Sequence, residues 1–210
     1  MPDARRYRVL QITSTAAIGG AEQVALELAR GCDPDRFEMR VASLGGPPLL
    51  TEACRRAAPP IPAWHWNVPP WRLDRIARFL REQHRLGLDL VHTYGLRADL
   101  AARLLRPLIG RARLLCAIHS TDAWRERGKV LLDRWTAGAA DGFVSVSLVG
   151  RDLRIRRECL RADRIAWIPN GIRVDRDDLA DRNAVRRSLG IAADAFPVIA
   201  HVANLRPMKG

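Results

Sequence analysis

Lysine is almost missing from this chain of 210 residues. Lys129 and Lys209 are the only two, although lysine and arginine together number 35, so arginine supplies nearly all of a formal net charge of +12. A positive surplus of this size favours anionic partners, such as nucleotide phosphates, anionic lipid or nucleic acid. No recognised nucleic-acid-binding module accompanies the charge, so we expect no nucleic-acid partner.

Cysteine is sparse and unpaired. The four cysteines lie far apart, with no Cys-x-x-Cys pair and no histidine at the spacing of a metal site. We therefore expect reduced thiols, as in a cytoplasmic protein, and no bound metal.

Long hydrophobic runs are missing too. The best candidate for a membrane span is broken by Asp99, Arg103 and Arg106, and the chain enters a predicted strand at Tyr7 without the apolar core of a signal peptide. These absences predict a cytoplasmic protein that attaches at most peripherally, at the inner face of the membrane.

Several catalytic motifs are also absent. The chain contains no Gly-x-Ser-x-Gly elbow, no His-Glu-x-x-His pair and no phosphate-binding P-loop. Ser145 and Ser147 lie at the end of a predicted strand, but no base is placed to activate either hydroxyl. Hydrolysis by a Ser-His-Asp triad is therefore disfavoured.

What the sequence does contain is a steady alternation of strand and helix patterns. Apolar runs predict strands at Tyr7–Thr13, Phe37–Leu44, Ile61–Trp66, Leu88–Thr93, Arg113–His119, Gly142–Val146 and Ile165–Ile168. Helical spacing predicts helices at Ala21–Arg30, Ala98–Leu105, Ala123–Ala137 and Val149–Glu158, one that includes Leu73–Leu80 and a short one that ends near Ala58. This alternation is typical of an α/β fold with a doubly wound, Rossmann-like parallel sheet, in which ligands sit at the carboxyl ends of the strands.

The chain is predicted to divide into two parts. Residues 1–175 form the α/β domain, near whose end the triplet Pro169–Gly171 predicts a tight turn. Residues 176–210 contain the rest of a charged linker, a short helix and a buried strand at Val198–Ala203 that opens into a basic turn. No helix follows to cover that strand, so we expect this part to be the start of an incomplete second domain.

Two adjacent glycines, Gly19 and Gly20, separate the first strand from the first helix. Glycine lets the backbone approach a ligand closely, and the start of a helix offers N–H groups to an anion. An ordinary glycine-rich connection would also explain the pair. Dinucleotide binding is disfavoured, because the spacing is not Gly-x-Gly-x-x-Gly and the second strand ends in residues 42–44 (Ala-Ser-Leu) without an acid.

His119 ends the fifth predicted strand, a position that points into the crevice where such sheets bind ligands. A lone histidine is often structural, but at this position a binding or catalytic role is open as well. His92 and Tyr94, at the end of the neighbouring strand, would shape the same crevice, with His92 supporting the sheet.

Trp64, Trp66 and Trp71 precede a helix that carries five arginines between Arg72 and Arg85. Aromatic residues beside a basic helix could press against an anionic membrane or an acidic acceptor. The interpretation that we favour is a solvated arginine face, with the tryptophans packed on the sheet.

Six short motifs occur along the chain. They are Gly19-Gly20-Ala21-Glu22-x-Val24 with Leu28-Ala29, Val91-His92-Thr93-Tyr94, the strand-end His119, Val144-Ser-Val-Ser147, Ile168-Pro-Asn-Gly-Ile172 and Val202-Ala-Asn-Leu-Arg-Pro-Met-Lys-Gly210. Each motif is weak evidence for a family when taken alone, but the six occur in the expected order and cover nearly the whole chain. Together they resemble the GT-B glycosyltransferases, specifically the large retaining group called family 4.

The resemblance implies two Rossmann-like domains that face each other across a cleft. The N-terminal domain would bind the acceptor, and the C-terminal domain would bind a nucleotide-diphosphate sugar as the donor. Such an enzyme transfers the sugar with retention to a hydroxyl of a saccharide or lipid-linked acceptor, in the synthesis of envelope polysaccharide or glycolipid. The resemblance implies no metal and no other cofactor.

The same resemblance implies roles for individual residues. His119 would be catalytic and touch the transferred sugar. The donor phosphates would lie against Gly19, Gly20, Asn204, Arg206 and Lys209, the acceptor-side cleft would be lined by Glu22, His92 and Tyr94, and Asn170 and Gly171 would form the interdomain turn. A fixed cation at Lys209 would lower the barrier, because negative charge builds up on the departing diphosphate.

Two departures from the family pattern have consequences. Asn204 stands where many relatives carry arginine, with Arg206 as the candidate substitute. The Glu-x7-Glu motif that grips the donor would lie beyond Gly210, so we expect these 210 residues alone to have no transferase activity.

Two other classes of function are alternatives for this sequence. The first is a truncated, non-catalytic module that binds an acceptor or an anionic membrane surface. The second, a nicotinamide-dependent oxidoreductase, is disfavoured by the missing acid after the second strand.

Overall fold

The computed structural model describes residues 5–67, 69, 72–120, 126–171 and 181–201. The chain divides into two compact units, Met1–Asn170 and Gly171–Gly210. The predicted domain boundary at residue 175 lies outside the described residues. The first unit holds the sheet and the candidate site.

The first unit is built on a parallel sheet. Its strands are β1 (Tyr7–Thr13), β2 (Phe37–Ser43), β3 (Ala63–His65), β4 (Leu90–Tyr94), β5 (Arg113–Ile118), β6 (Gly142–Ser145) and β7 (Ile165–Trp167). They lie in the order β3-β2-β1-β4-β5-β6-β7, and every neighbouring pair is parallel. The predicted α/β class and doubly wound sheet are confirmed, and each predicted strand of this unit is found close to its predicted bounds.

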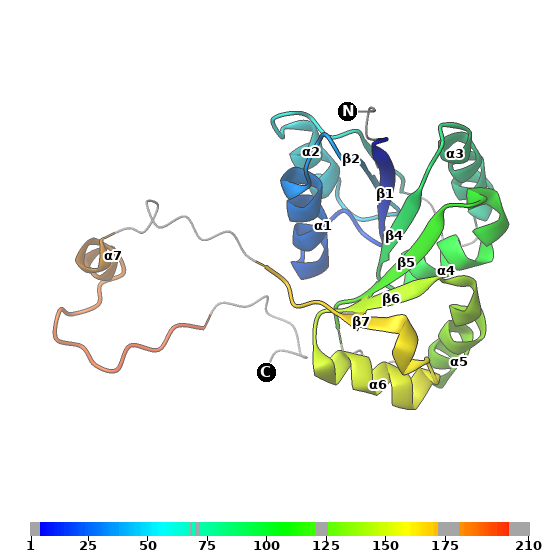
Figure 1. Cartoon of the computed structure of the whole chain (residues 1–210). Coiled ribbons are helices and arrows are strands. Elements are labelled where there is room, and N and C mark those ends of the chain that lie inside the picture. The colour runs from blue at the N-terminus through cyan, green and yellow to red at the C-terminus, as the bar shows by residue number, and fades with distance from the viewer. Residues whose placement is uncertain (1–4, 68, 70–71, 121–125, 172–180, 202–210) are drawn as a thin grey trace. The chain divides into compact units, whose positions relative to one another are not determined.

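Helices connect the strands and cover both faces of the sheet. They are α1 (Gly20–Gly31), α2 (Leu49–Arg55), α3 (Leu73–Arg85), α4 (Leu96–Leu104), α5 (Arg127–Thr136) and α6 (Leu148–Glu158), with short 3-10 turns at Arg106–Ile109, Ala137–Ala139 and Ala162–Arg164. Figure 1 shows α1 and α2 on one face and α3 to α6 on the other. Two covering layers explain why β1 is buried from Val9 to Thr13, as is typical of parallel strands. None of the described helices is long and apolar enough to cross a membrane.

Trp64 and Trp66 pack against α3. Their rings lie 5.2 and 4.2 Å from the ring of Phe79, in edge-on contacts. The helix keeps its apolar side chains in the core, while the arginines between Arg72 and Arg85 are exposed. The favoured interpretation of packed tryptophans beside a solvated arginine face is confirmed for these two rings, and Trp71 lies outside the described residues.

The second unit contributes one helix among its described residues, α7 (Arg182–Ser188). The carboxylate of Asp181 caps its start by accepting from two backbone N–H groups. The prediction of a strand at Val198–Ala203 is wrong for residues 198–201, which belong to no strand. The last two residues of the predicted strand lie outside the described residues. A strand needs a hydrogen-bonding neighbour, which the described part of this unit does not offer, and Ile199 is 88% exposed.

Charged side chains hold α4, α5 and α6 together in the interior of the first unit. Arg103 of α4, whose side chain is only 2% exposed, pairs with Asp133 of α5. Arg154 of α6 lies 3.2 Å from the same carboxylate and also pairs with Glu158, and Asp99 lies 3.9 Å from Arg103. Cations and carboxylates are buried side by side, and such pairing is what allows ions to leave water.

Replacing Arg103 by methionine would remove one cation from this cluster and leave the buried Asp133 with one ion-pair partner fewer. We expect the free energy of unfolding in urea to fall by about 3–5 kcal/mol. Arg113→Gln is the matched control, because that side chain is 76% exposed and exposed ion pairs contribute less than about 1 kcal/mol. Equal losses in the two variants would contradict a structural role for the cluster.

Candidate functional site

A pocket opens where the strand order reverses, between β1 and β4. In doubly wound sheets ligands bind at such a switch point, beside the carboxyl ends of the strands. The pocket has a volume of about 360 Å³, and Ser14, Glu22, Tyr94 and His119 are among the residues that line it. The fold therefore gathers side chains from four separate segments at one edge of the sheet.

A second pocket of about 360 Å³ lies at the opposite edge, where Tyr7, Phe37 and Arg113 begin their strands. It is lined by none of the residues that the sequence predicted for the site. The pocket at the carboxyl ends is therefore the candidate functional site.

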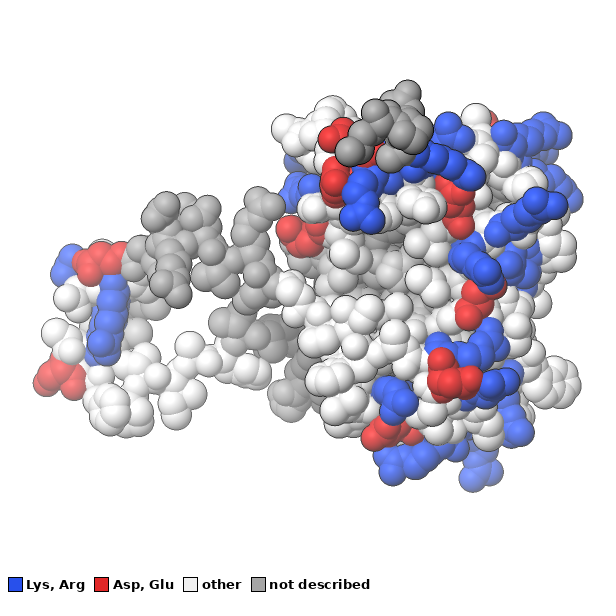
Figure 2. Space-filling model, viewed as in Figure 1, with Lys and Arg blue, Asp and Glu red and all other residues white. Residues whose placement is uncertain are grey.

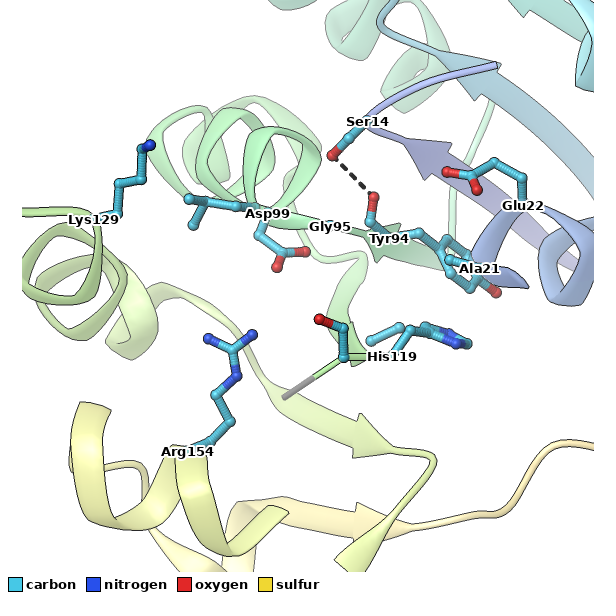
Figure 3. A pocket seen from close by; sticks show the side chains of 12 residues that line it. Ser14, Ala21, Glu22, Tyr94, Gly95, Asp99, His119, Lys129 and Arg154 are labelled. Carbon is cyan, nitrogen blue, oxygen red and sulfur yellow. Dashed lines mark hydrogen bonds between the residues drawn. The ribbon is translucent and has the colours of Figure 1, made fainter. Parts of the chain in front are cut away.

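Ser14 joins the end of β1 to the start of α4. Its hydroxyl donates to the carbonyl of Tyr94 at 3.0 Å, the bond dashed in Figure 3, and accepts from the N–H of Ala98 at 3.1 Å. Gly95 lies between them with φ +89°, and a Cβ there would come within 2.7 Å of the Ser14 hydroxyl oxygen. Because glycine alone tolerates this conformation at so short a distance, Gly95 allows the two strand ends to meet.

The two predicted glycines begin α1 and differ in their surroundings. The Glu22 carboxylate accepts from the N–H of Gly19 at 3.2 Å, and a Cβ at Gly19 would lie 3.0 Å from that carboxylate. Apart from its chain neighbours and the backbone of its own helix, a Cβ at Gly20 would meet no atom within 4 Å. The backbone at Gly20 is therefore open to a ligand, whereas Glu22 fills the space beside Gly19.

Tyr94 stands at the centre of a chain of hydrogen bonds that crosses from β4 through β1 to α1. Its hydroxyl donates to Gln11 Oε1 at 2.6 Å and lies 3.0 Å from His92 Nδ1, while Gln11 Nε2 donates to the carbonyl of Ala25 at 2.9 Å. Because that carbonyl can only accept, the amide nitrogen of Gln11 faces α1 and its oxygen faces Tyr94. The single hydroxyl proton of Tyr94 is therefore committed to Gln11.

This commitment decides which nitrogen of His92 carries the proton. The Tyr94 hydroxyl can only accept from His92, so in the neutral ring Nδ1 is protonated and Nε2 is bare. Burial and, to a smaller extent, the nearby His119 together lower the pKa of His92 to about 4. Nε2 is itself buried, and the described residues give it no hydrogen-bond partner. At neutral pH His92 is therefore an uncharged donor that holds Tyr94 in place.

His119 follows β5 and lines the pocket. Its ring lies 5.4 Å from the ring of Tyr94, with 35° between the ring planes. Burial lowers the pKa of His119 below the usual value of histidine, so the ring is uncharged at neutral pH and can both donate and accept a hydrogen bond. The hydrogen bonds of Tyr94 thus fix the surface against which His119 packs.

The other wall of the pocket is charged. Figure 3 shows Arg154 reaching from α6 toward Asp99 of α4, with Lys129 of α5 farther out. Asp99 accepts from the Thr93 hydroxyl at 2.5 Å, and burial raises the pKa of Asp99 to about 6, against the opposing effect of Arg103. A polar ligand that enters the pocket would therefore meet charges of both signs on this wall.

The structure brings some of the predicted residues together. Glu22, Tyr94 and His119 line one pocket, Gly20 begins the helix beside it, and His92 supports it through Tyr94. Other predicted residues lie elsewhere: Asn170 and Gly171 are exposed, in no helix or strand, where the two units divide, and Asn204, Arg206 and Lys209 lie outside the described residues.

Sequence reasoning missed several residues of the pocket and its support, namely Gln11, Ser14, Gly95, Asp99, Lys129 and Arg154. Ser14 and Gly95 each come directly after a strand, and that position alone could have marked them. Asp99 and Arg103 stand four residues apart in a predicted helix, the spacing of an ion pair. Lys129 and Arg154 carry no signal that a single sequence reveals.

The side chains present bear on two other kinds of site, a metal site and a dinucleotide-binding site. Among the described residues, no group of three or more His, Cys, Asp or Glu could hold a metal ion. At the end of β2, where a dinucleotide site would place a carboxylate, Ser43 is buried and its hydroxyl lies 2.7 Å from that of Thr13. This strand end gives no support to dinucleotide binding.

Solved structures share the fold of this chain. HepE from Anabaena, solved with UDP and glucose, has a TM-score of 0.69 at 18% identity, covering 88% of this chain and 50% of HepE. A glycosyltransferase from Rickettsia africae has a TM-score of 0.68 at 16% identity, covering 90% and 51%. The lipopolysaccharide outer core galactosyltransferase WaaB has a TM-score of 0.59 at 13% identity, covering 80% and 47%. The chain has the Rossmann-like fold of GT-B glycosyltransferases and spans about half the length of these proteins.

The family follows from the sequence itself. Residues 18–176 match Glycosyltransferase Family 4, and the chain belongs to this family. The resemblance drawn from the six motifs is confirmed. No curated protein matches the chain in sequence.

The lowered pKa of His92 predicts a stability that depends on pH. The imidazole titrates near pH 6.5 when unfolded and near 4 when folded. As the pH falls through this window, the unfolded chain binds a proton that the folded chain does not, so folding is weakened by acid. Between about pH 6.5 and about pH 5, the free energy of unfolding of the parent should fall by about 1.5 kcal/mol relative to His92→Gln, whose amide can still donate to Tyr94.

Urea unfolding of both proteins at the two pH values measures this difference. Subtracting one protein from the other cancels groups that titrate in both, including Asp99. A difference that stays constant with pH would show that His92 is not buried as a neutral ring.

Proposed function

We propose that this chain is the acceptor-binding lobe of a retaining glycosyltransferase, which moves a sugar from a nucleotide-diphosphate donor to a hydroxyl group. The observation that carries the proposal is the pocket at the switch point, where the open start of α1 and the uncharged His119 meet. Membership of family 4 supports the reaction class. The acceptor that we propose is a saccharide or a lipid-linked saccharide of the cell envelope.

The start of α1 suits the diphosphate side of the donor. The first turn of a helix has N–H groups without intrahelical partners, and these groups attract anions. The carboxylate of Glu22 already occupies the N–H of Gly19 and would repel a phosphate there, so Gly20 is the better contact. UDP and UDP-glucose are bound by HepE, a protein of the same fold, which supports this donor class.

The chemical step breaks the bond between the sugar C1 and the diphosphate oxygen and forms a bond between C1 and the acceptor oxygen. The acceptor's hydroxyl proton leaves with the diphosphate, and attack from the same face accounts for retention. His119, as a neutral ring, can hydrogen-bond a hydroxyl of the transferred sugar and hold C1 beside the acceptor oxygen. We propose that Lys209 neutralises the negative charge that develops on the leaving diphosphate, as the family pattern implies. Arg206 would assist Lys209 in this role.

The acceptor would be recognised by the walls of the pocket that the donor does not contact. Glu22 on one side can accept hydrogen bonds from sugar hydroxyls. Lys129 on the other side is half exposed and pairs with Glu126 at 3.3 Å. A cation at the outer part of a pocket suits an acceptor with a phosphate or carboxylate group.

The test of this function uses the longest natural polypeptide that contains this chain, supplied with a panel of nucleotide sugars and saccharide acceptors. We expect transfer by the parent, and His119→Ala should lower kcat by about 100- to 1000-fold, the usual cost of losing one fixed transition-state contact. These 210 residues alone should show no turnover, since they span about half of the matched enzymes. Transfer that survives in His119→Ala would contradict the assigned role, and no transfer from any donor would overturn the function.

Gly20→Ala separates ligand binding from folding. Apart from its chain neighbours and the backbone of its own helix, a methyl group at Gly20 meets no protein atom within 4 Å, so the melting temperature should not fall, but the methyl would stand where the donor approaches. We expect KM for the nucleotide sugar to rise about tenfold or more. Gly31→Ala is the matched control, because Gly31 lies at the other end of the same helix and an added Cβ there also meets nothing within 4 Å. An unchanged KM in Gly20→Ala would place the donor elsewhere.

A further inference from the structure

Helix α5 buries a carboxylate and exposes its largest apolar side chains. Asp133 is the buried residue of this helix, held by Arg103 and Arg154. Trp135 is 84% exposed, and Leu131 and Leu132 are 54% and 42% exposed. A surface helix normally buries its apolar stripe, so α5 is oriented the opposite way.

The exposed apolar residues form one continuous strip. Gly128, Leu131, Leu132 and Trp135 follow the spacing i, i+3, i+4, i+7, which places them on one side of a helix. Arg127 and Arg134 border the strip along one edge, and Lys129 borders it along the other. Each of these three cations is exposed. We refer to these seven residues as the α5 strip.

We propose that the α5 strip binds the surface of an anionic lipid bilayer. An apolar stripe flanked by cations is the pattern by which a helix lies in a membrane interface, with apolar groups below the headgroups and cations among the phosphates. Tryptophan is the side chain best suited to this depth, because its ring is apolar and its N–H is polar. The net charge of +12 adds a long-range attraction to the same surface.

A second copy of this chain is a poorer occupant. A symmetric dimer would place the same strip on both subunits and bring Arg127, Arg134 and Lys129 of one copy toward those of the other. The strip is also a single helix of ten residues, which offers less surface than a stable protein interface needs.

Helix α3 has the charge for a membrane surface but lacks the apolar part. Its arginines are exposed, yet its large apolar side chains pack in the core, and Trp64 and Trp66 lie against Phe79. Figure 2 shows lysine and arginine over the side of the molecule where α3, α5 and α6 lie. Of these cationic surfaces, α5 combines positive charge with an exposed tryptophan. Membrane binding is weak when a surface offers only a single apolar anchor or only positive charge.

The α5 strip also adjoins the pocket. Lys129 belongs to the strip and lines the candidate site, so a bilayer on α5 would bring lipid headgroups close to the pocket mouth. The membrane proposal itself rests on the surface of α5 and stands whether or not the pocket transfers sugar.

Vesicle flotation with the 210-residue chain tests the proposal. The probes are vesicles of phosphatidylcholine alone and of phosphatidylcholine mixed equally with phosphatidylglycerol. The variant Leu131→Ser/Trp135→Ser removes exposed apolar groups, and Arg78→Gln/Arg81→Gln on α3 is the matched surface control. Circular dichroism and the melting temperature are measured to check that each variant is folded. We expect both variants to fold, because the four replaced side chains are exposed.

We expect the parent to float with the anionic vesicles and not with phosphatidylcholine alone. The α5 variant should bind at least about fivefold more weakly, whereas the α3 control should lose much less. The proposal is overturned if the parent does not bind anionic vesicles or if the α5 variant binds them as well as the parent does. A dimer that Leu131→Ser/Trp135→Ser dissociates, without any binding to lipid, would identify the strip as a protein interface and equally overturn it.

Discussion

The hydroxyl of Tyr94 ties together the parts from which the candidate site is made. By giving its proton to Gln11, it fixes the end of β4 against β1 and, through Gln11, against the helix that begins at the paired glycines. The same bond obliges His92 to donate, and the ring of Tyr94 is the surface against which His119 packs. Groups that are held in this way need little rearrangement when a ligand binds, and fixed groups of this kind are the ones that stabilise a transition state.

A second constraint acts from the opposite wall. Asp133 has to face inward to neutralise Arg103 and Arg154, and this need sets the rotation of α5 about its axis. With Asp133 inside, Trp135 faces outward and Lys129 reaches the pocket. One buried carboxylate therefore connects the stability of the α4–α6 layer, the charge of the pocket wall and the proposed membrane surface.

The fold could be predicted from the sequence because strands that are covered on both faces appear as apolar runs, and β1 was predicted at its observed bounds. Tyr94 and His119 could be found because parallel strands gather their carboxyl ends at one edge. Gln11 could not, since nothing beside it indicates that its partner is 83 residues away. Helical periodicity would have predicted that α5 buries its leucines and Trp135. It could not reveal that Asp133 faces inward, because the ion partners of Asp133 come from two other helices. The strand predicted at Val198–Ala203 had a suitable apolar run, but pairing depends on a neighbour that the run itself does not reveal.

The central claim is that the donor and acceptor meet at the carboxyl ends of β1, β4 and β5, beside Gly20 and His119. Site-resolved hydrogen exchange on the longest natural polypeptide that contains this chain, with and without a nucleotide sugar, tests the claim most directly. The account predicts slower exchange of the backbone N–H groups of Gly20 and Ala21 and of the segment at His119 when the sugar nucleotide is bound. Protection that instead appears at the opposite edge of the sheet, around Tyr7, Phe37 and Arg113, would contradict it.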